Sequence, residues 1–248
     1  MKIKKGIYIV PNLFTTGNIF CGFYSIVSVI NKNFYHAAWA ILVATIFDAL
    51  DGRVARWTHA TSDFGVQYDS LSDLVSFGMA PALLVYMWVL QPFGRIGWLA
   101  AFLFVICAAL RLARFNTHAA EDEGHSFEGL PTPAAAIMVA STVIMTKDLL
   151  LMDKIHPLIS VMVVYSLAFL MVSSVKYRSF KHLELTKKKS FSILLFAILL
   201  IYIIVAMPEL FIFLIISAYV IDGPLEWLLF HRKEAIESNK VVEKHIHR

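Results

Sequence analysis

The chain has 248 residues, of which 58% are hydrophobic, and its mean hydropathy is +0.69. This apolar share exceeds the share that soluble domains usually carry, so a single water-soluble core is excluded. The formal net charge of +4 is informative mainly through where the charges lie along the chain. The two cysteines, Cys21 and Cys107, provide neither a disulfide framework nor a metal-ligand spacing, and we expect both to be packing residues.

Apolar stretches long enough to cross a bilayer recur along the whole chain. In chain order, we expect eight spans near residues 12–31, 34–51, 68–90, 96–115, 133–151, 155–175, 190–206 and 208–230. Most connections between them are short. The sequence therefore predicts an all-α, polytopic transmembrane helix bundle, with one transmembrane domain over residues 1–230 and a charged cytoplasmic tail over residues 231–248.

Basic residues are distributed unevenly between the two sides of this predicted bundle. If the N-terminus is cytoplasmic, only four of the 22 Lys and Arg residues fall on the opposite side: Lys32, Arg95, Lys147 and Lys154. By the positive-inside rule, we expect both termini to face the cytoplasm, in a cell inner (cytoplasmic) membrane. The same orientation puts the cytoplasmic ends of spans two and three within reach of water-soluble substrates.

Four aspartates lie at those two ends, in the pattern D-x-x-D-G-x-x-A-R, eight residues, G-x-x-x-D-x-x-x-D from Asp48 to Asp73. At about 100° per residue, each helix would present its pair of carboxylates on one face, so both pairs can share one space. An intramembrane aspartate costs about 2.5–3.5 kcal/mol by insertion scales. Four of them need a compensating partner, and divalent cations such as Mg²⁺ prefer oxygen ligands.

The aspartate pattern resembles the signature of the CDP-alcohol phosphatidyltransferases, which are integral membrane enzymes of phospholipid synthesis. Further blocks resemble the membrane-embedded phosphatidylserine synthases within that family: Pro11–Phe23, Ala109–Asn116, Gly129–Ala136 and Ser174–Lys181. The resemblance implies a six-helix family core and a homodimer. It also implies transfer of the phosphatidyl group of CDP-diacylglycerol to the hydroxyl of L-serine, with release of CMP.

The resemblance also implies roles for individual residues. Two divalent cations, Mg²⁺ or Mn²⁺, are expected on Asp48, Asp51, Asp69 and Asp73, and Asp73 is expected to serve also as the general base. The expected contacts with the CDP-lipid are Gly52, Ala55, Arg56, Gly65, Thr15 and Asn18. The expected contacts with the acceptor are Arg111, Arg114, Lys176 and Arg178.

Each of these roles has an alternative. Small residues also let transmembrane helices pack closely, and arginines also anchor helices at the membrane interface. Within the family, the acceptor could instead be glycerol 3-phosphate or an inositol phosphate, since the basic segment 176–189 could bind a phosphate. A more distant alternative is a cation-coupled transporter, because intramembrane carboxylates often mark ion pathways. We expect membrane lipid as a partner and no nucleic acid.

Overall fold

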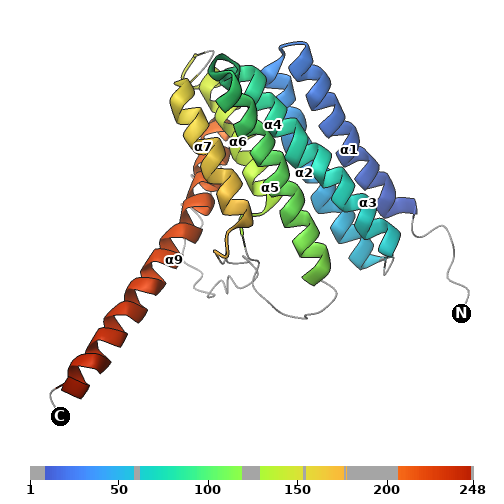
Figure 1. Cartoon of the computed structure of the whole chain (residues 1–248). Coiled ribbons are helices and arrows are strands. Elements are labelled where there is room, and N and C mark those ends of the chain that lie inside the picture. Colours follow the sequence, from blue (N-terminus) through green and yellow to red (C-terminus); the bar gives the residue numbers. More distant parts are fainter. Residues whose placement is uncertain are drawn as a thin grey trace, which may run out of the picture.

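The computed structural model describes residues 9–58, 62–118, 129–152, 155–175, 177 and 206–246, with side chains up to residue 228. Every regular element in these ranges is helical, as the sequence predicts. Two long helices open the chain, α1 (Ile9–Ile30) and α2 (Phe34–Trp57), and they pack side by side (Figure 1). A tight turn joins them, with Lys32 at a φ of 60°.

The third helical run is continuous from Asp63 to Phe93 but changes its winding along its length. It begins as α3 (Asp63–Asp73), passes through the π-helical stretch η1 (Leu74–Met79), and returns to α-helix in α4 (Ala80–Val85). A second π-helical stretch, η2 (Tyr86–Leu90), leads to a 3₁₀ turn, η3 (Gln91–Phe93). Short π-helical stretches inside helices are frequent at functional sites, and η1 begins directly after Asp73.

Four further helices complete the described bundle: α5 (Arg95–His118), α6 (Thr132–Asp148), α7 (Pro157–Val172) and α9 (Pro208–Ile246). Figure 1 shows α9 passing the bundle and continuing beyond it to the C-terminal end. Helices occur at every predicted span except 190–206, of which residues 190–205 lie outside the described residues. Because α9 continues to Ile246, the backbone of the predicted tail is helical up to that residue; the domain boundary at residue 230 stays a prediction.

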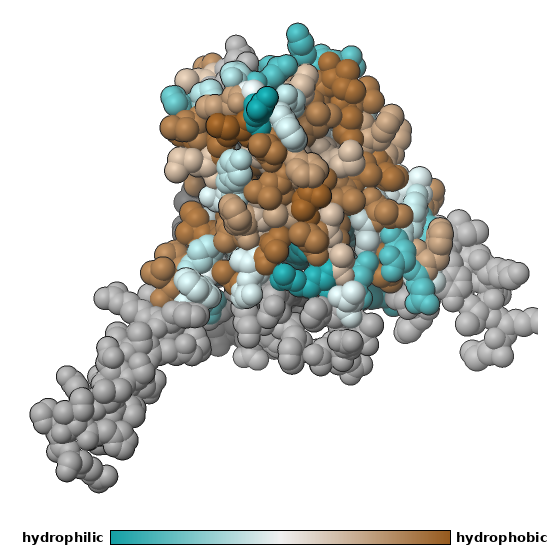
Figure 2. Space-filling model, in the orientation of Figure 1, coloured by the Kyte–Doolittle hydropathy of each residue, from teal (hydrophilic) through white to brown (hydrophobic). Residues whose placement is uncertain are grey.

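Four helical stretches of the described chain are long and apolar enough to cross a membrane: Val10–Ile30, Asp63–Phe93, Arg95–Thr117 and Pro208–Leu228. The other described helices are either shorter, as α6 and α7 are, or carry several charges, as α2 does. The sequence-based count of eight spans is therefore supported only approximately. Hydrophobic side chains cover the middle of the visible surface, and hydrophilic ones gather toward its two ends (Figure 2).

Small residues let the helices approach closely in the interior. Ala37, Ala38 and Ala44 of α2 and Ala135 and Ala136 of α6 are fully buried. α1 and the third run are in close contact at Gly22, where a Cβ would collide with Ser76. Close packing through small residues is typical of helices in membranes, and here it fixes α1 and α2 against the helix that carries Asp69 and Asp73.

Candidate active site between α1, α2 and α3

Three of the four predicted carboxylates converge where α2 ends and α3 begins. Asp48, Asp51 and Asp69 each offer an oxygen, and these oxygens all lie within 4.8 Å of one another. The chain reverses between the two helices, and Ser62 caps α3 by accepting a hydrogen bond from the Gly65 N–H at 3.0 Å. This reversal brings the two aspartate pairs together, as the spacing in the sequence predicts.

The protein alone does not balance the negative charges of this carboxylate cluster. Asp51 is 4% exposed, and its Oδ2, like the buried Oδ1 of Asp69, has no hydrogen-bond partner among the described residues. The charges of Asp48 and Asp69 both act on Asp51. Carboxylate charges this close repel one another. The cluster offers only oxygen atoms as ligands. This donor set suits a hard divalent cation, so the three side chains could hold a metal ion.

Asp73 lies beside this group and is held from α1. The side-chain amide of Asn18 donates to Oδ1 of Asp73 at 3.0 Å, and both residues are buried. Two serine hydroxyls of the same helical run bind carbonyls of α1: Ser72 donates to Thr15 at 3.1 Å, and Ser76 donates to Asn18 at 2.9 Å. Three hydrogen bonds thus fix the position of Asp73 relative to α1.

The two α1 residues predicted to contact the CDP-lipid line the carboxylate cluster. The Thr15 hydroxyl is within hydrogen-bonding reach of Asp51, and it also donates to the Pro11 carbonyl at 3.2 Å. Asn18 is fully buried, and its Oδ1 has no hydrogen-bond partner among the described residues. The sequence did not indicate that the Asn18 amide would donate to Asp73.

The remaining residues predicted to contact the CDP-lipid differ in exposure. Gly52 is exposed, and a Cβ added there would meet no atom within 4 Å. Helix packing therefore does not account for a glycine at this position, and open space for a substrate remains. Arg56 is exposed as well, and Ala55 is half-buried. Gly65 is half-buried, and a Cβ there would lie 3.2 Å from the Ser62 hydroxyl, so close contact at the α3 start also favours a small residue.

The two arginines predicted to bind the acceptor have different surroundings, although both lie on α5. Arg111 donates through Nη1 to the Thr132 hydroxyl at 3.2 Å, and its charge is within electrostatic reach of Asp73. Its Nε is buried without a partner among the described residues, and an unsatisfied buried donor costs about 1–3 kcal/mol. Arg114 donates instead to the Val172 carbonyl at 3.3 Å. Lys176 and Arg178 lie outside the described residues.

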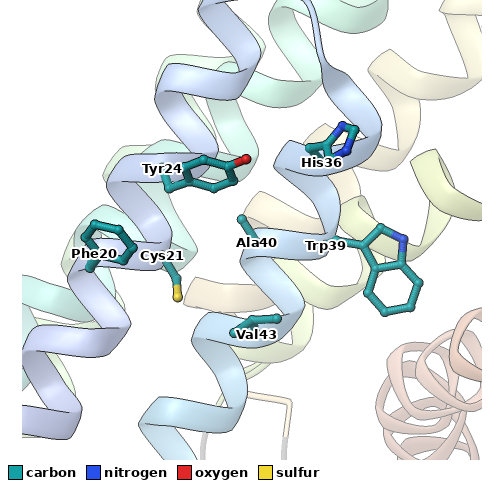
Figure 3. A pocket seen from close by; sticks show the side chains of 7 residues that line it. All are labelled: Phe20, Cys21, Tyr24, His36, Trp39, Ala40 and Val43. Atoms are coloured by element: carbon teal, nitrogen blue, oxygen red, sulfur yellow. The ribbon is translucent and has the colours of Figure 1, made fainter.

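A cavity of about 310 Å³ between α1 and α2 is separate from the carboxylate cluster. None of the predicted site residues lines it. Figure 3 shows its lining, which is Phe20, Cys21, Tyr24, His36, Trp39, Ala40 and Val43. The cavity contains no carboxylate, so it is not where the reaction chemistry lies.

Comparisons with known proteins agree with this site. The model of the family "CDP-alcohol phosphatidyltransferase" matches residues 8–172, which include all four aspartates. A CDP-diacylglycerol–serine O-phosphatidyltransferase of Helicobacter pylori is 37% identical over 234 residues, covering 94% of this chain and 97% of the relative. The protein of the same name from Bacillus subtilis is 34% identical over 172 residues, covering 69% of this chain and 91% of the relative. An archaetidylserine synthase of Methanothermobacter thermautotrophicus is 37% identical over 169 residues, covering 67% of this chain and 68% of the relative.

Proposed function

Because this chain belongs to the CDP-alcohol phosphatidyltransferase family, we propose that it transfers the phosphatidyl group of CDP-diacylglycerol to the hydroxyl of L-serine and releases CMP. The observation that carries the proposal is the partly buried carboxylate cluster with Asp73 beside it. The family and the four apolar helices make the chain an integral membrane enzyme. The transporter alternative is set aside by this family membership.

The reaction must overcome repulsion between an oxygen nucleophile and an anionic diphosphate. In our proposal, Asp48, Asp51 and Asp69, with Asp73, hold two divalent cations, Mg²⁺ or Mn²⁺. Such cations neutralise the diphosphate and stabilise the attacking and leaving oxygens. The exposed backbone at Gly52 leaves room for the diphosphate to approach α2, and Arg56 can pair with its oxygens.

Asp73 is the proposed general base. It accepts the proton of the serine hydroxyl as the serine oxygen forms its bond to the phosphorus of the phosphatidyl group. The bond from that phosphorus to the bridging oxygen of CMP breaks, and CMP leaves with the electron pair. A general base must lie within hydrogen-bond reach of the proton that it removes, and the Asn18 amide holds the Asp73 carboxylate in one orientation for this step.

The test is an assay of the purified enzyme with CDP-diacylglycerol and radiolabelled L-serine. We expect the label to enter lipid only when the donor is present, with one CMP released for each phosphatidylserine formed. Glycerol 3-phosphate and inositol phosphate are the competing acceptors to include. If either is used in preference to serine, the acceptor assignment fails while the transferase chemistry stands.

Cation dependence can be tested on the same protein. Chelation should abolish turnover, and added Mg²⁺ or Mn²⁺ should restore it, since the clustered carboxylates otherwise repel one another and the diphosphate. The cation should also raise the melting temperature of the wild type, because a ligand that binds only the folded state stabilises it. Asp51→Asn should weaken that stabilisation. Full turnover in excess chelator would contradict the metal assignment.

A further inference from the structure

The buried oxygen of Asp69 has no partner that would fix the direction of its side chain. This Oδ1 is without a hydrogen-bond partner among the described residues, whereas Oδ1 of Asp73 accepts the Asn18 amide. Asp69 nevertheless turns toward Asp48 and Asp51, since the oxygens of the three side chains lie within 4.8 Å of one another. The rotation of α3 about its own axis therefore contributes directly to where the Asp69 carboxylate points.

Hydrogen bonds hold α3 on both sides of Asp69. At about 100° per residue, Tyr68 and Ser70 each lie about 100° from Asp69, in opposite directions around the helix. The Tyr68 hydroxyl shares a hydrogen bond with the Thr16 hydroxyl of α1, with 3.1 Å between the two oxygens. On the other side, Asn116 of α5 donates through Nδ2 to the Ser70 hydroxyl at 2.9 Å. Each hydrogen bond opposes a rotation of α3, so the pair keeps Asp69 facing one way.

The contact between Asn116 and Ser70 links two helices at the end of the bundle that carries the carboxylates. Both side chains are half-buried. The Ser70 hydroxyl can itself donate, either to Oδ1 of Asn116 at 3.3 Å or to the Val66 carbonyl of α3 at 3.1 Å. α5 packs on the third helical run along η1, and the Asn116 side chain extends this contact back to α3. Figure 1 shows α3 and the last turns of α5 at the same end of the bundle.

We propose that Asn116 is a positioning residue of the carboxylate cluster. Through Ser70, it holds α3 in the rotation that turns Asp69 toward the two carboxylates of α2. This inference rests on the proposed function, in which the cluster holds divalent cations. Groups that bind a metal must be kept within about 10–20° of their productive geometry. Loss of the link between α3 and α5 therefore weakens cation binding before it unfolds the bundle.

Asn116→Ala tests the proposal through cation binding rather than through turnover. In the wild type, added Mg²⁺ or Mn²⁺ should raise the melting temperature as the cation concentration increases. In Asn116→Ala, the concentration needed for the same rise should be about three- to tenfold higher, the range expected for loss of one hydrogen bond. The melting temperature without cation should fall by no more than about 4 °C.

Ser70→Ala removes the same hydrogen bond from its other end, and it keeps the test open if Asn116→Ala folds poorly. It should raise the required cation concentration by a similar factor. The double variant should need no more cation than either single variant, because both substitutions remove one shared interaction. Ser166→Ala on the exposed face of α7 is the matched control. That hydroxyl also donates to a carbonyl four residues earlier, at 2.8 Å, but its loss should leave the cation requirement unchanged.

The outcomes separate this inference from the proposed function. An equal cation requirement in the wild type and Asn116→Ala would overturn the positioning role while leaving the proposed function intact. Fully additive effects of the two substitutions would overturn the role as well, since Asn116 would then not act through Ser70. A wild type that neither Mg²⁺ nor Mn²⁺ stabilises would overturn the metal assignment and this inference with it, whereas transfer to serine is decided separately by the radiolabel assay.

Discussion

Asn18 joins α1 to the proposed general base. Its amide donates to Asp73 at 3.0 Å, and its own Oδ1 is buried without a partner among the described residues. Because only one side of the asparagine amide is used, the other is available to a substrate group that donates. Asn18 therefore has two proposed roles, orienting the base and contacting substrate.

Replacing Asn18 separates these roles. Asn18→Ala should lower kcat about tenfold or more, because the base loses the donor that orients it. Asn18→Asp has nearly the same shape but places a carboxylate against Asp73, so its kcat should fall further. Asn31→Ala, in the exposed turn after α1, is the control and should behave as wild type. If Asn18→Asp turned over at the wild-type rate, the orienting role would be refuted.

Asp73→Asn tests the general base directly. The amide keeps the size of the side chain but cannot accept the serine proton, so the rate should fall below about a tenth of wild type, in the range expected for loss of general-base catalysis. CDP-diacylglycerol binding, measured by titration, should fall less than the rate. The melting temperature should stay close to that of wild type. A variant that retained more than about a tenth of the activity would contradict this assignment.

At the scale of helices, the contact between α1 and the third run sets the position of the carboxylates on α3. Gly22→Ala should force these helices apart, because the added Cβ collides with the Ser76 backbone and side chain. Overpacking of this kind typically costs about 1–3 kcal/mol. We expect a lower melting temperature and a lower kcat, although residue 22 lies outside the carboxylate cluster.

Gly52→Ala is the matched comparison for Gly22→Ala. It adds the same methyl group where no atom beyond its own helix backbone lies within 4 Å, so the melting temperature should stay or rise slightly, because alanine favours a helix over glycine. If the diphosphate approaches the α2 backbone here, the KM for CDP-diacylglycerol should rise instead. A variant that is as stable as wild type or more stable and has an unchanged KM would remove Gly52 from the binding site.

Sequence reasoning predicted the helices and the convergence of the aspartates, because helical spacing alone puts each pair on one face of its helix. It did not predict which contacts form between distant helices. The Asn18–Asp73 bond joins residues 55 positions apart, and its formation depends on how each helix is rotated in the bundle. When a helix is apolar on every side, its residue pattern does not indicate which face turns toward the neighbouring helices. For the same reason, the sequence of α9 did not indicate which of its faces packs on the bundle.

At the scale of the whole molecule, the surface is consistent with immersion in a bilayer. Large apolar side chains such as Leu13, Phe20, Phe23 and Ile30 are exposed along α1, and soluble proteins rarely expose a patch of this extent. Lys and Arg residues gather in the segments that we assign to the cytoplasm. This orientation remains a proposal, as does the homodimer that the family resemblance implies.

Single-cysteine labelling tests the orientation. Asn31→Cys lies in the turn after α1, and Lys244→Cys lies near the C-terminal end. A membrane-impermeant maleimide should label Asn31→Cys in intact cells and Lys244→Cys only after permeabilisation. Cys21 and Cys107 are buried and should give little background. The opposite labelling order would invert the proposed topology.

The chain order of the site residues has a consequence for synthesis. All four aspartates lie between residues 48 and 73, on helices that leave the ribosome early, whereas α9 is the last described helix. The carboxylates can therefore come together in the membrane while most of the chain is still being made. Helix α9 arrives only near the end. On our assignment, a nascent enzyme acquires the groups that perform the transfer before α9 packs against α6, and the bundle around the site is complete only when translation is nearly finished.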